Sequence, residues 1–351
     1  MVRFAIGSLV AACASIAHAD GALDPDADFA ARRSAPGVVR AVDFDGAIPV
    51  TRFHADQAIQ PGWQTTPQLD TQVKSSGKGS LRFDIPEKGF DNSSGAFYTN
   101  FSPDLSVRFG EGQEFFVQWR QRFSASFLVN KYAAKGGGVT SAKLAIVTAG
   151  DTAQKKYGSC EAIGVVTASW SNKVPISYDS CTGSASHKAY KGMYQPAPKP
   201  AFWLIQNGMP KPSCPYGGPG SWNDRTLRGV PPTCFPYYAD EWMTFEQRLK
   251  LGHRVGDEWV DSVYQLWVAR EGQQPVLVID WRPGIPGYWQ LTAGKAAEDQ
   301  RFGKVWLTPF MTKRDANAVA AAPASIWYDE LLISTQPIAF PGGHALRVPR
   351  N

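Results

Sequence analysis

The chain has 351 residues, of which 43% are hydrophobic and 12% aromatic, and its formal net charge at pH 7 is +5. After residue 20 no segment is apolar over the length that a membrane-spanning helix needs, which excludes that class of membrane protein. Glycine-rich phosphate loops, a GxSxG nucleophile elbow and zinc-ligand spacings do not occur. We therefore expect no cofactor, no metal ion and no nucleic-acid partner, and we expect a monomer.

The first nineteen residues are typical of a secretory signal peptide. An apolar run follows Arg3, and a small-x-small sequence ends the segment at Ala19. An alternative is lipid anchoring, because residues 10–13 resemble a bacterial lipobox that would modify Cys13. We expect cleavage after Ala19 and a secreted or periplasmic protein.

Cleavage there leaves an even number of cysteines, which suits two disulfides in an oxidising compartment. They are Cys160, Cys181, Cys214 and Cys234. Three connectivities are possible. We predict the two local pairs, Cys160 with Cys181 across a strand pair and Cys214 with Cys234 across a loop. Metal ligation is disfavoured because no CxxC spacing occurs.

Residues 20–38 are polar and rich in alanine and proline, and we expect a flexible leader there. From residue 39 to about residue 340 the pattern is one of short alternating segments separated by turn residues, which predicts a single all-β domain, a sandwich or a barrel. The predicted strands are 80–85, 114–123, 142–149, 161–170, 242–251, 261–271, 275–281, 303–311 and 325–334.

Two regions interrupt this rhythm. Residues 182–240 are rich in proline, glycine and aromatic residues, and a stretch of that length without clear strands favours a functional loop. Trp222 lies in it, where its ring is suited to stacking on a sugar. Residues 312–324 are expected to be a surface loop. Tryptophans inside predicted strands are expected in the core; they are Trp119, Trp267 and Trp306.

The segment EFFVQWRQRF, residues 114–123, puts three polar side chains on one strand face, because successive side chains point to opposite faces. Gln118, Arg120 and Arg122 share that face, while Trp119 lies on the other. Two arginines so close together call for an anion. The anion is either internal, from Glu161 or Glu246 on a neighbouring strand, or the carboxylate of an acidic substrate.

The order of these segments resembles the concanavalin A-like jelly roll shared by alginate, glucuronan and heparin lyases. The resemblance covers residues 40–335 and is carried by sequence segments in a fixed order: VQWRQRF, EWMTFEQRLKLG, VYQLWVARE, GKVWLTPF and IWYDELLIS. It implies a sandwich of two antiparallel sheets with long loops. It also implies a polysaccharide ligand. The family's late YFKAGxY-like segment reads Pro309-Phe310-Met311-Thr312-Lys313 here, without the tyrosine, and a partial echo occurs at residues 190–195.

The function that the resemblance implies is cleavage of an acidic polysaccharide by β-elimination. This reaction needs a group that neutralises the sugar carboxylate, a base and an acid. Arg120 is the candidate for the first role, and His187, Tyr190 and Tyr194 are the candidates for proton transfer. The predicted substrate-binding residues are Gln118, Arg122, Lys143, Lys191, Gln195 and Trp222.

Two alternatives stay open. A non-catalytic carbohydrate-binding protein could use the same face, and the missing tyrosine favours this alternative. A glycoside hydrolase of this fold needs two carboxylates close together. The ExDxxE pattern of laminarinase-like enzymes is absent, and Glu258 and Asp261 point to opposite faces of a regular strand.

Overall fold

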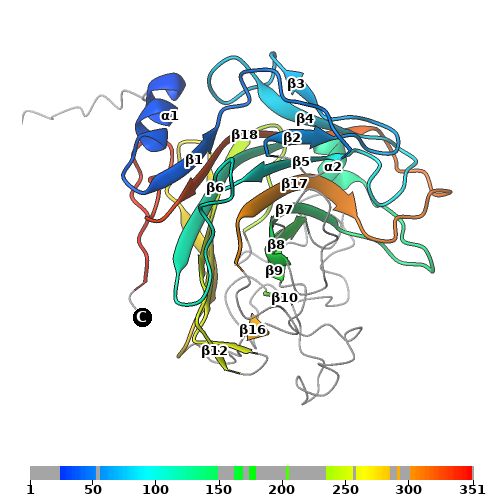
Figure 1. Ribbon diagram of the computed structural model, residues 1–351. Coiled ribbons are helices and arrows are strands. Elements are labelled where there is room, and N and C mark those ends of the chain that lie inside the picture. The colour runs from blue at the N-terminus through cyan, green and yellow to red at the C-terminus, as the bar shows by residue number, and fades with distance from the viewer. Residues whose placement is uncertain are drawn as a thin grey trace, which may run out of the picture.

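The computed structural model describes residues 24–52, 56–148, 162–168, 174–178, 203–204, 235–255, 258–284, 291–292 and 301–349. Within these ranges the chain forms two large antiparallel sheets packed face to face, a jelly-roll sandwich, which confirms the predicted fold class (Figure 1). No helix of the described residues is long and apolar enough to cross a membrane.

Sheet A is named here as the sheet that contains residues 114–123. Its strands, in spatial order, are β15 (Val276–Trp281), β14 (Val263–Arg270), β11 (Trp242–Lys250), β6 (Glu114–Phe123), β18 (Ala324–Ser334), β4 (Ser80–Ile85) and β3 (Gln68–Asp70), and β1 (Val38–Val42) also pairs with β18. The bounds of β4 and β6 coincide with the predicted ones, and the other predicted strands of this sheet agree within two residues.

Sheet B faces sheet A across the core. Its strands, in spatial order, are β10 (Trp203–Leu204), β9 (Val174–Tyr178), β8 (Ala162–Ala168), β7 (Ala142–Thr148), β17 (Lys304–Met311), β5 (Ala96–Asn100) and β2 (Ala58–Gln60). A small third sheet joins β12 (His253–Val255), β13 (Glu258–Val260) and β16 (Leu291–Thr292). The strands β1, β2, β3 and β5 were not predicted, because their segments are short and do not alternate clearly.

The core between the sheets is apolar and rich in aromatic rings. Large side chains of both sheets meet there and are buried; they include Val117, Trp119, Phe245, Leu249 and Leu307, and the burial of Trp119 was predicted. Trp119 stacks on Phe245 with ring centroids 5.4 Å apart, a geometry that adds to the area that the two rings bury. The register predicted for β6 is therefore confirmed, and its alternate residues face away from the core.

The expected flexible leader contains a helix instead. Helix α1 (Pro25–Arg33) begins after Asp24, whose side chain accepts a hydrogen bond from the backbone of Asp26, and Pro25 occupies its first turn. Both features favour a helix start. A second, short helix is α2 (Ala125–Val129). Intrinsic helix propensity alone does not stabilise helices as short as these two. Helix α1 therefore depends on its contacts with sheet A.

The outer face of a sheet is defined here as the face turned away from the core. On sheet A, helix α1 and the C-terminal segment 338–348 lie against this face (Figure 1). Phe29 of α1 packs with Leu332 of β18 and with Ile338. Phe340 packs with Trp267, which is buried but lies on the outer face and not in the core between the sheets.

Candidate functional site

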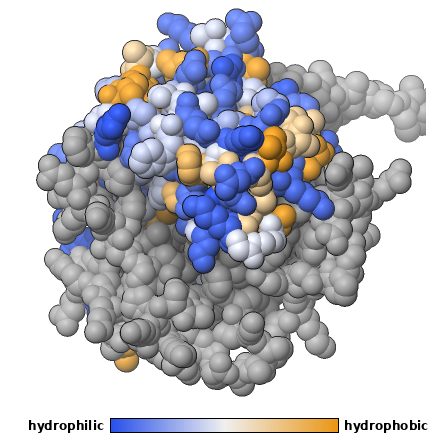
Figure 2. Space-filling model, turned by 90° about the vertical axis from the view of Figure 1, so that its right-hand side faces the viewer, coloured by the Kyte–Doolittle hydropathy of each residue, from blue (hydrophilic) through white to orange (hydrophobic). Residues whose placement is uncertain are grey.

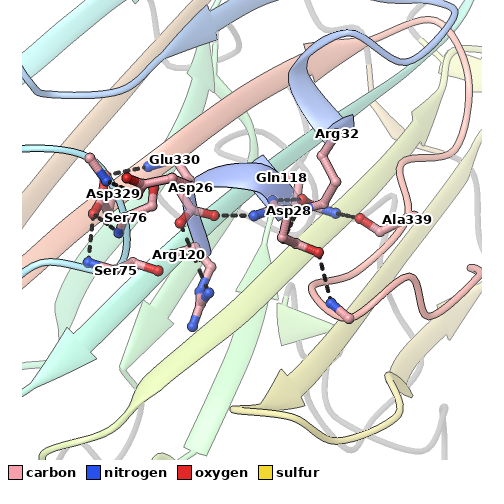
Figure 3. A network of polar contacts seen from close by, with 12 residues as sticks. Asp26, Asp28, Arg32, Ser75, Ser76, Gln118, Arg120, Asp329, Glu330 and Ala339 are labelled. Carbon is pink, nitrogen blue, oxygen red and sulfur yellow. Dashed lines mark hydrogen bonds and ion pairs between the residues drawn. The ribbon is translucent and has the colours of Figure 1, made fainter. Parts of the chain in front are cut away.

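The polar face of β6 is occupied by other parts of the protein. Gln118 donates from Nε2 to Glu246 Oε2 at 2.7 Å and to the carbonyl oxygen of Ala339 at 3.2 Å. Its Oε1 accepts a hydrogen bond from Arg32 of α1 at 2.9 Å. Both ends of this amide are thus satisfied internally (Figure 3).

Arg120, 4% exposed, has carboxylate partners on the same face. It forms an ion pair with Glu271, and its Nη1 lies 4.0 Å from Glu330 Oε1. Glu330 also pairs with Arg32. The internal-anion interpretation expected Glu161 or Glu246 as the partner; Glu246 bonds Gln118 instead, and Glu161 lies outside the described residues. Arg122 is half-buried between its register partners on β11 and β18.

Carboxyl groups in this region are deeply buried. Burial raises the pKa of Glu246 to about 8, although Ile338 N and Gln118 donate to its oxygens. Burial, and next the charge of Glu330, raise the pKa of Asp329 well above its usual range. We call Arg32, Gln118, Arg120, Glu246 and Glu330 the clamp network. It ties α1 and the C-terminal segment to sheet A, so most polar groups of the network have protein partners, while Arg120 Nε and Glu330 Oε1 are buried without a hydrogen bond among the described residues.

The outer face of sheet B carries a different set of polar groups. Lys304 of β17 lies in register between Asn100 of β5 and Thr148 of β7, so the three side chains share one face. All three residues are at most 5% exposed. Within the described part of the chain, Asn100 Oδ1 and Thr148 Oγ1 are buried and have no hydrogen-bond partner. We call these residues the lysine row.

Lys304 is electrostatically unusual. Burial lowers the pKa of its amine from 10.5 to about 8, and the negative charge of Asp56 opposes this shift. Asp56 is itself engaged: it accepts hydrogen bonds from Arg40 at 3.0 Å and from the backbone of Asn100 at 3.0 Å. An amine with a pKa close to neutrality can both hold and release a proton under ordinary conditions.

Aromatic rings continue the same face along β17. Tyr98 stacks on Trp306 with centroids 5.5 Å apart, and Phe310 contacts Trp306 edge-on at 5.7 Å. Lys143 of β7 places its Nζ 5.0 Å from the centroid of the Phe310 ring. Trp306, Phe310 and Lys143 are half-buried, so part of each side chain stays accessible. Trp306 was expected in the core, but its two neighbours in β17 are the core residues, so Trp306 lies on the outer face.

Lys143 is the predicted substrate-binding residue that lies with this group. Burial lowers the pKa of its amine, and the charge of Asp91 opposes the shift. The face thus combines two amines, a stacked set of rings and two polar atoms that have no hydrogen-bond partner among the described residues. Such a combination suits an extended anionic ligand with ring faces that can stack.

Other predicted site residues lie outside the described residues. They are His187, Tyr190, Lys191, Tyr194, Gln195 and Trp222, together with Cys160, Cys181, Cys214, Cys234 and the signal segment 1–19. Sequence reasoning missed Lys304, Asn100 and Tyr98. The alternation of Lys304 and Trp306 within GKVWLTPF was a usable signal, because it puts a cation and an indole on one face.

Comparison with known proteins adds likenesses at the level of structure. No family model and no curated protein sequence matches the chain. An endo-β-1,4-glucuronan lyase from the fungus Trichoderma reesei is 11% identical over 85% of this chain and 96% of its own, with a TM-score of 0.41. A marine alginate lyase from Aplysia kurodai is 11% identical over 85% and 99%, with a TM-score of 0.42. An alginate lyase from Chlorella virus is 11% identical over 76% and 89%, with a TM-score of 0.34. At these scores the fold assignment rests on the strand order of the two sheets.

Proposed function

We propose that the protein is a secreted lyase that cleaves an acidic, uronate-containing polysaccharide by β-elimination on the outer face of sheet B. The observation that carries the proposal is the lysine row, where a buried amine stands between two polar atoms that lack partners among the described residues. Buried polar atoms normally have partners, so atoms of a ligand are their natural complement.

The row offers groups suited to each part of the reaction. In β-elimination a base removes the proton at C5, the C5–H electron pair forms the C4–C5 double bond, and the bond from C4 to the leaving oxygen breaks. Lys304 is assigned as the base, because an amine with a pKa near 8 is partly neutral at neutral pH. In this proposal Thr148 Oγ1 donates to the sugar carboxylate, and Asn100 Oδ1 accepts a hydrogen bond from a sugar hydroxyl.

Binding of a polymer, more than of a single sugar, is supported by the length of the face. Lys304 and Phe310 are separated by roughly 20 Å along β17, at the usual rise of a strand. This distance spans several sugar units. Lys143, beside Phe310, would then bind a second carboxylate, while the stacked Tyr98 and Trp306 support the sugar rings between the two amines.

The proton-transfer residues predicted from the sequence lie outside the described residues and stay predictions. His187, Tyr190 and Tyr194 lie between β9 and β10, and both of these strands belong to sheet B. They remain our candidates for the acid that protonates the leaving oxygen, with Lys191, Gln195 and Trp222 as candidates for substrate binding. Gln118 and Arg120 belong to sheet A, where their contacts favour a structural role, and Arg122 lies on the same strand.

A non-catalytic carbohydrate-binding protein is the second candidate function. The segment Pro309–Lys313 favours it, because it lacks the tyrosine that the lyases that the sequence resembles carry in their late segment. A hydrolase is the third candidate, and it would cleave without forming a double bond.

The test is incubation of the secreted protein with alginate, glucuronan, heparin and pectin. A lyase produces an unsaturated uronate that absorbs in the ultraviolet; a hydrolase releases reducing ends without that absorbance; a binding protein is retarded in a polymer-containing gel without releasing products. We expect Lys304→Met to lower the lyase rate by roughly 10²–10⁴-fold, the usual contribution of a general base. Lys78→Met is the control, because Lys78 is exposed and lies just before β4, a strand of sheet A. Full activity of Lys304→Met would remove Lys304 from the mechanism.

A further inference from the structure

Trp63 is the most exposed large hydrophobic side chain of the described residues, at 77%. Its backbone is nevertheless held in place. Trp63 N donates to the carbonyl oxygen of Asn92 at 3.0 Å, and Gln64 N donates to that of Ser93 at 3.0 Å. The fold gains no burial energy from an indole in water, so a fixed backbone that presents one calls for another explanation.

A second exposed ring lies on the loop to which Trp63 is bonded. Phe90 is 48% exposed, and its backbone N–H and carbonyl oxygen both bond with the Ser93 hydroxyl. Close approach of the two loops depends on Gly62, because a Cβ there would lie 2.4 Å from the carbonyl oxygen of Ser93. Trp63 and Phe90 therefore lie on two neighbouring turns that backbone hydrogen bonds hold together.

This pair of turns is continuous with the end of the sheet B face that holds Lys143. Asp91, next to Phe90, accepts a hydrogen bond at its carbonyl oxygen from Met311 N at 2.8 Å. The charge of the same residue acts on Lys143. Trp63 is hydrogen-bonded to Asn92, which follows Asp91 in the chain. Asp91 in turn lies near Lys143, which contacts Phe310.

The surroundings of the two rings carry charges of both signs, including the exposed Glu87 and the half-buried Asp91, and are only sparsely apolar. Arg314 donates to the carbonyl oxygens of Pro86 and Glu87, which brings the loop 312–315 to this corner. Lys313 on that loop and Lys88 are exposed. Figure 2 views the side toward which the β17–β18 loop points, and hydrophobic residues there form small groups among hydrophilic ones. A protein partner favours a broader apolar patch.

We propose that Trp63 and Phe90 form an aromatic subsite that stacks on a sugar ring of the polysaccharide, beyond the end of the sheet B face marked by Lys143 and Phe310. The inference rests on the proposed function, because it needs a polymer lying along that face. It predicts that the subsite is used by long chains and not by short oligosaccharides that fill only the lysine row.

The experiment compares wild type with Trp63→Ala and Phe90→Ala on a long acidic polymer and on its short oligosaccharides. We expect KM for the polymer, or Kd in affinity electrophoresis, to rise roughly five- to tenfold in Trp63→Ala, in line with the loss of aromatic stacking. The kcat value and the constants for short oligosaccharides should not change. Trp63→Phe should restore most of the polymer affinity, and Val276→Ala, an exposed hydrophobic residue of sheet A, serves as the control.

Each contrary outcome points to a distinct failure. Unchanged polymer constants in Trp63→Ala, with an active wild type, overturn the subsite and leave the proposed function intact. An altered oligomeric state with unchanged polymer affinity assigns the rings to a contact between copies of the chain and overturns it as well. A wild type that neither cleaves nor binds any acidic polymer overturns both proposals together.

Discussion

The outer faces of the two sheets present similar polar residues in opposite situations. On sheet A, Gln118 and Arg120 contact protein groups on α1, on β18 and in the C-terminal segment. On sheet B, Asn100 and Thr148 flank Lys304 with buried atoms that have no partner among the described residues. Buried atoms without a hydrogen bond occur on sheet A too, such as Arg120 Nε and Glu330 Oε1, so the two faces differ in what covers them: α1 and the C-terminal segment occupy the face of sheet A.

The largest expected effect is on the clamp network. Arg32→Ala should destabilise the fold by about 3–5 kcal/mol, because it leaves the buried Glu330 without this partner and releases α1. Arg33→Ala, at the neighbouring and half-exposed position, should change stability by less than about 0.5 kcal/mol. Chemical denaturation of both variants measures the contrast. Equal, small effects would mean that α1 does not depend on the buried arginine.

Arg120→Ala compares the structural and the substrate-binding roles of that residue directly. We expect a loss of stability of roughly 2–4 kcal/mol, smaller than for Arg32 because Glu271 is half-exposed. The preference for acidic over neutral polymers should not change. Thermal unfolding and polymer affinity are measured on the same variant; an unchanged melting temperature with lost selectivity would return the substrate site to sheet A.

The free energy of unfolding should depend on pH in opposite directions through Glu246 on sheet A and Lys304 on sheet B. The pKa of Glu246 is raised from 4.5 to about 8, so the fold favours the neutral carboxyl; the stabilisation is complete below pH 4.5 and is lost as the pH rises to about 8. The effect is on the order of a few kcal/mol. Glu246→Gln keeps a neutral side chain and should flatten the slope of unfolding free energy over this range. A slope that persists in the variant would assign the titration to another group.

The pKa of Lys304 is lowered from 10.5 to about 8, so the fold disfavours the charged amine. The penalty is complete below pH 8 and disappears as the pH rises toward 10.5, so wild type should gain stability across this range. Lys304→Met should abolish that gain and be at least as stable as wild type at pH 6, with activity lost. Denaturation at pH 6, 8 and 10 provides the measurement. A variant less stable than wild type at pH 6 would mean that the charged amine has a stabilising partner.

The smallest effect concerns Lys143. Because its side chain is half-buried and its charge faces Asp91, Lys143→Met should weaken binding of an acidic polymer by about three- to tenfold and reduce the salt dependence of binding. Lys78→Met again serves as the control. An unchanged salt dependence would exclude Lys143 from the contact with the polymer.

By itself the sequence determined the all-β class, the long strands and the phase of β6. Trp119 lies in the core and Gln118 and Arg120 face outward because alternation along a strand is a local property that the residues alone express. It did not predict β5, whose segment AFYTN is buried at every position and shows no alternation.

Only the tertiary structure decided what lies against each face. Residues 25–33 and 338–348 cover β6 through contacts that join distant parts of the chain, such as Arg32 to Glu330 and Glu246 to Ile338. The lysine row likewise depends on the adjacency of β5, β17 and β7, whose residues Asn100, Lys304 and Thr148 are far apart in sequence. Strand order and docked termini depend on how separate elements pack, and the pattern within one segment does not carry that information.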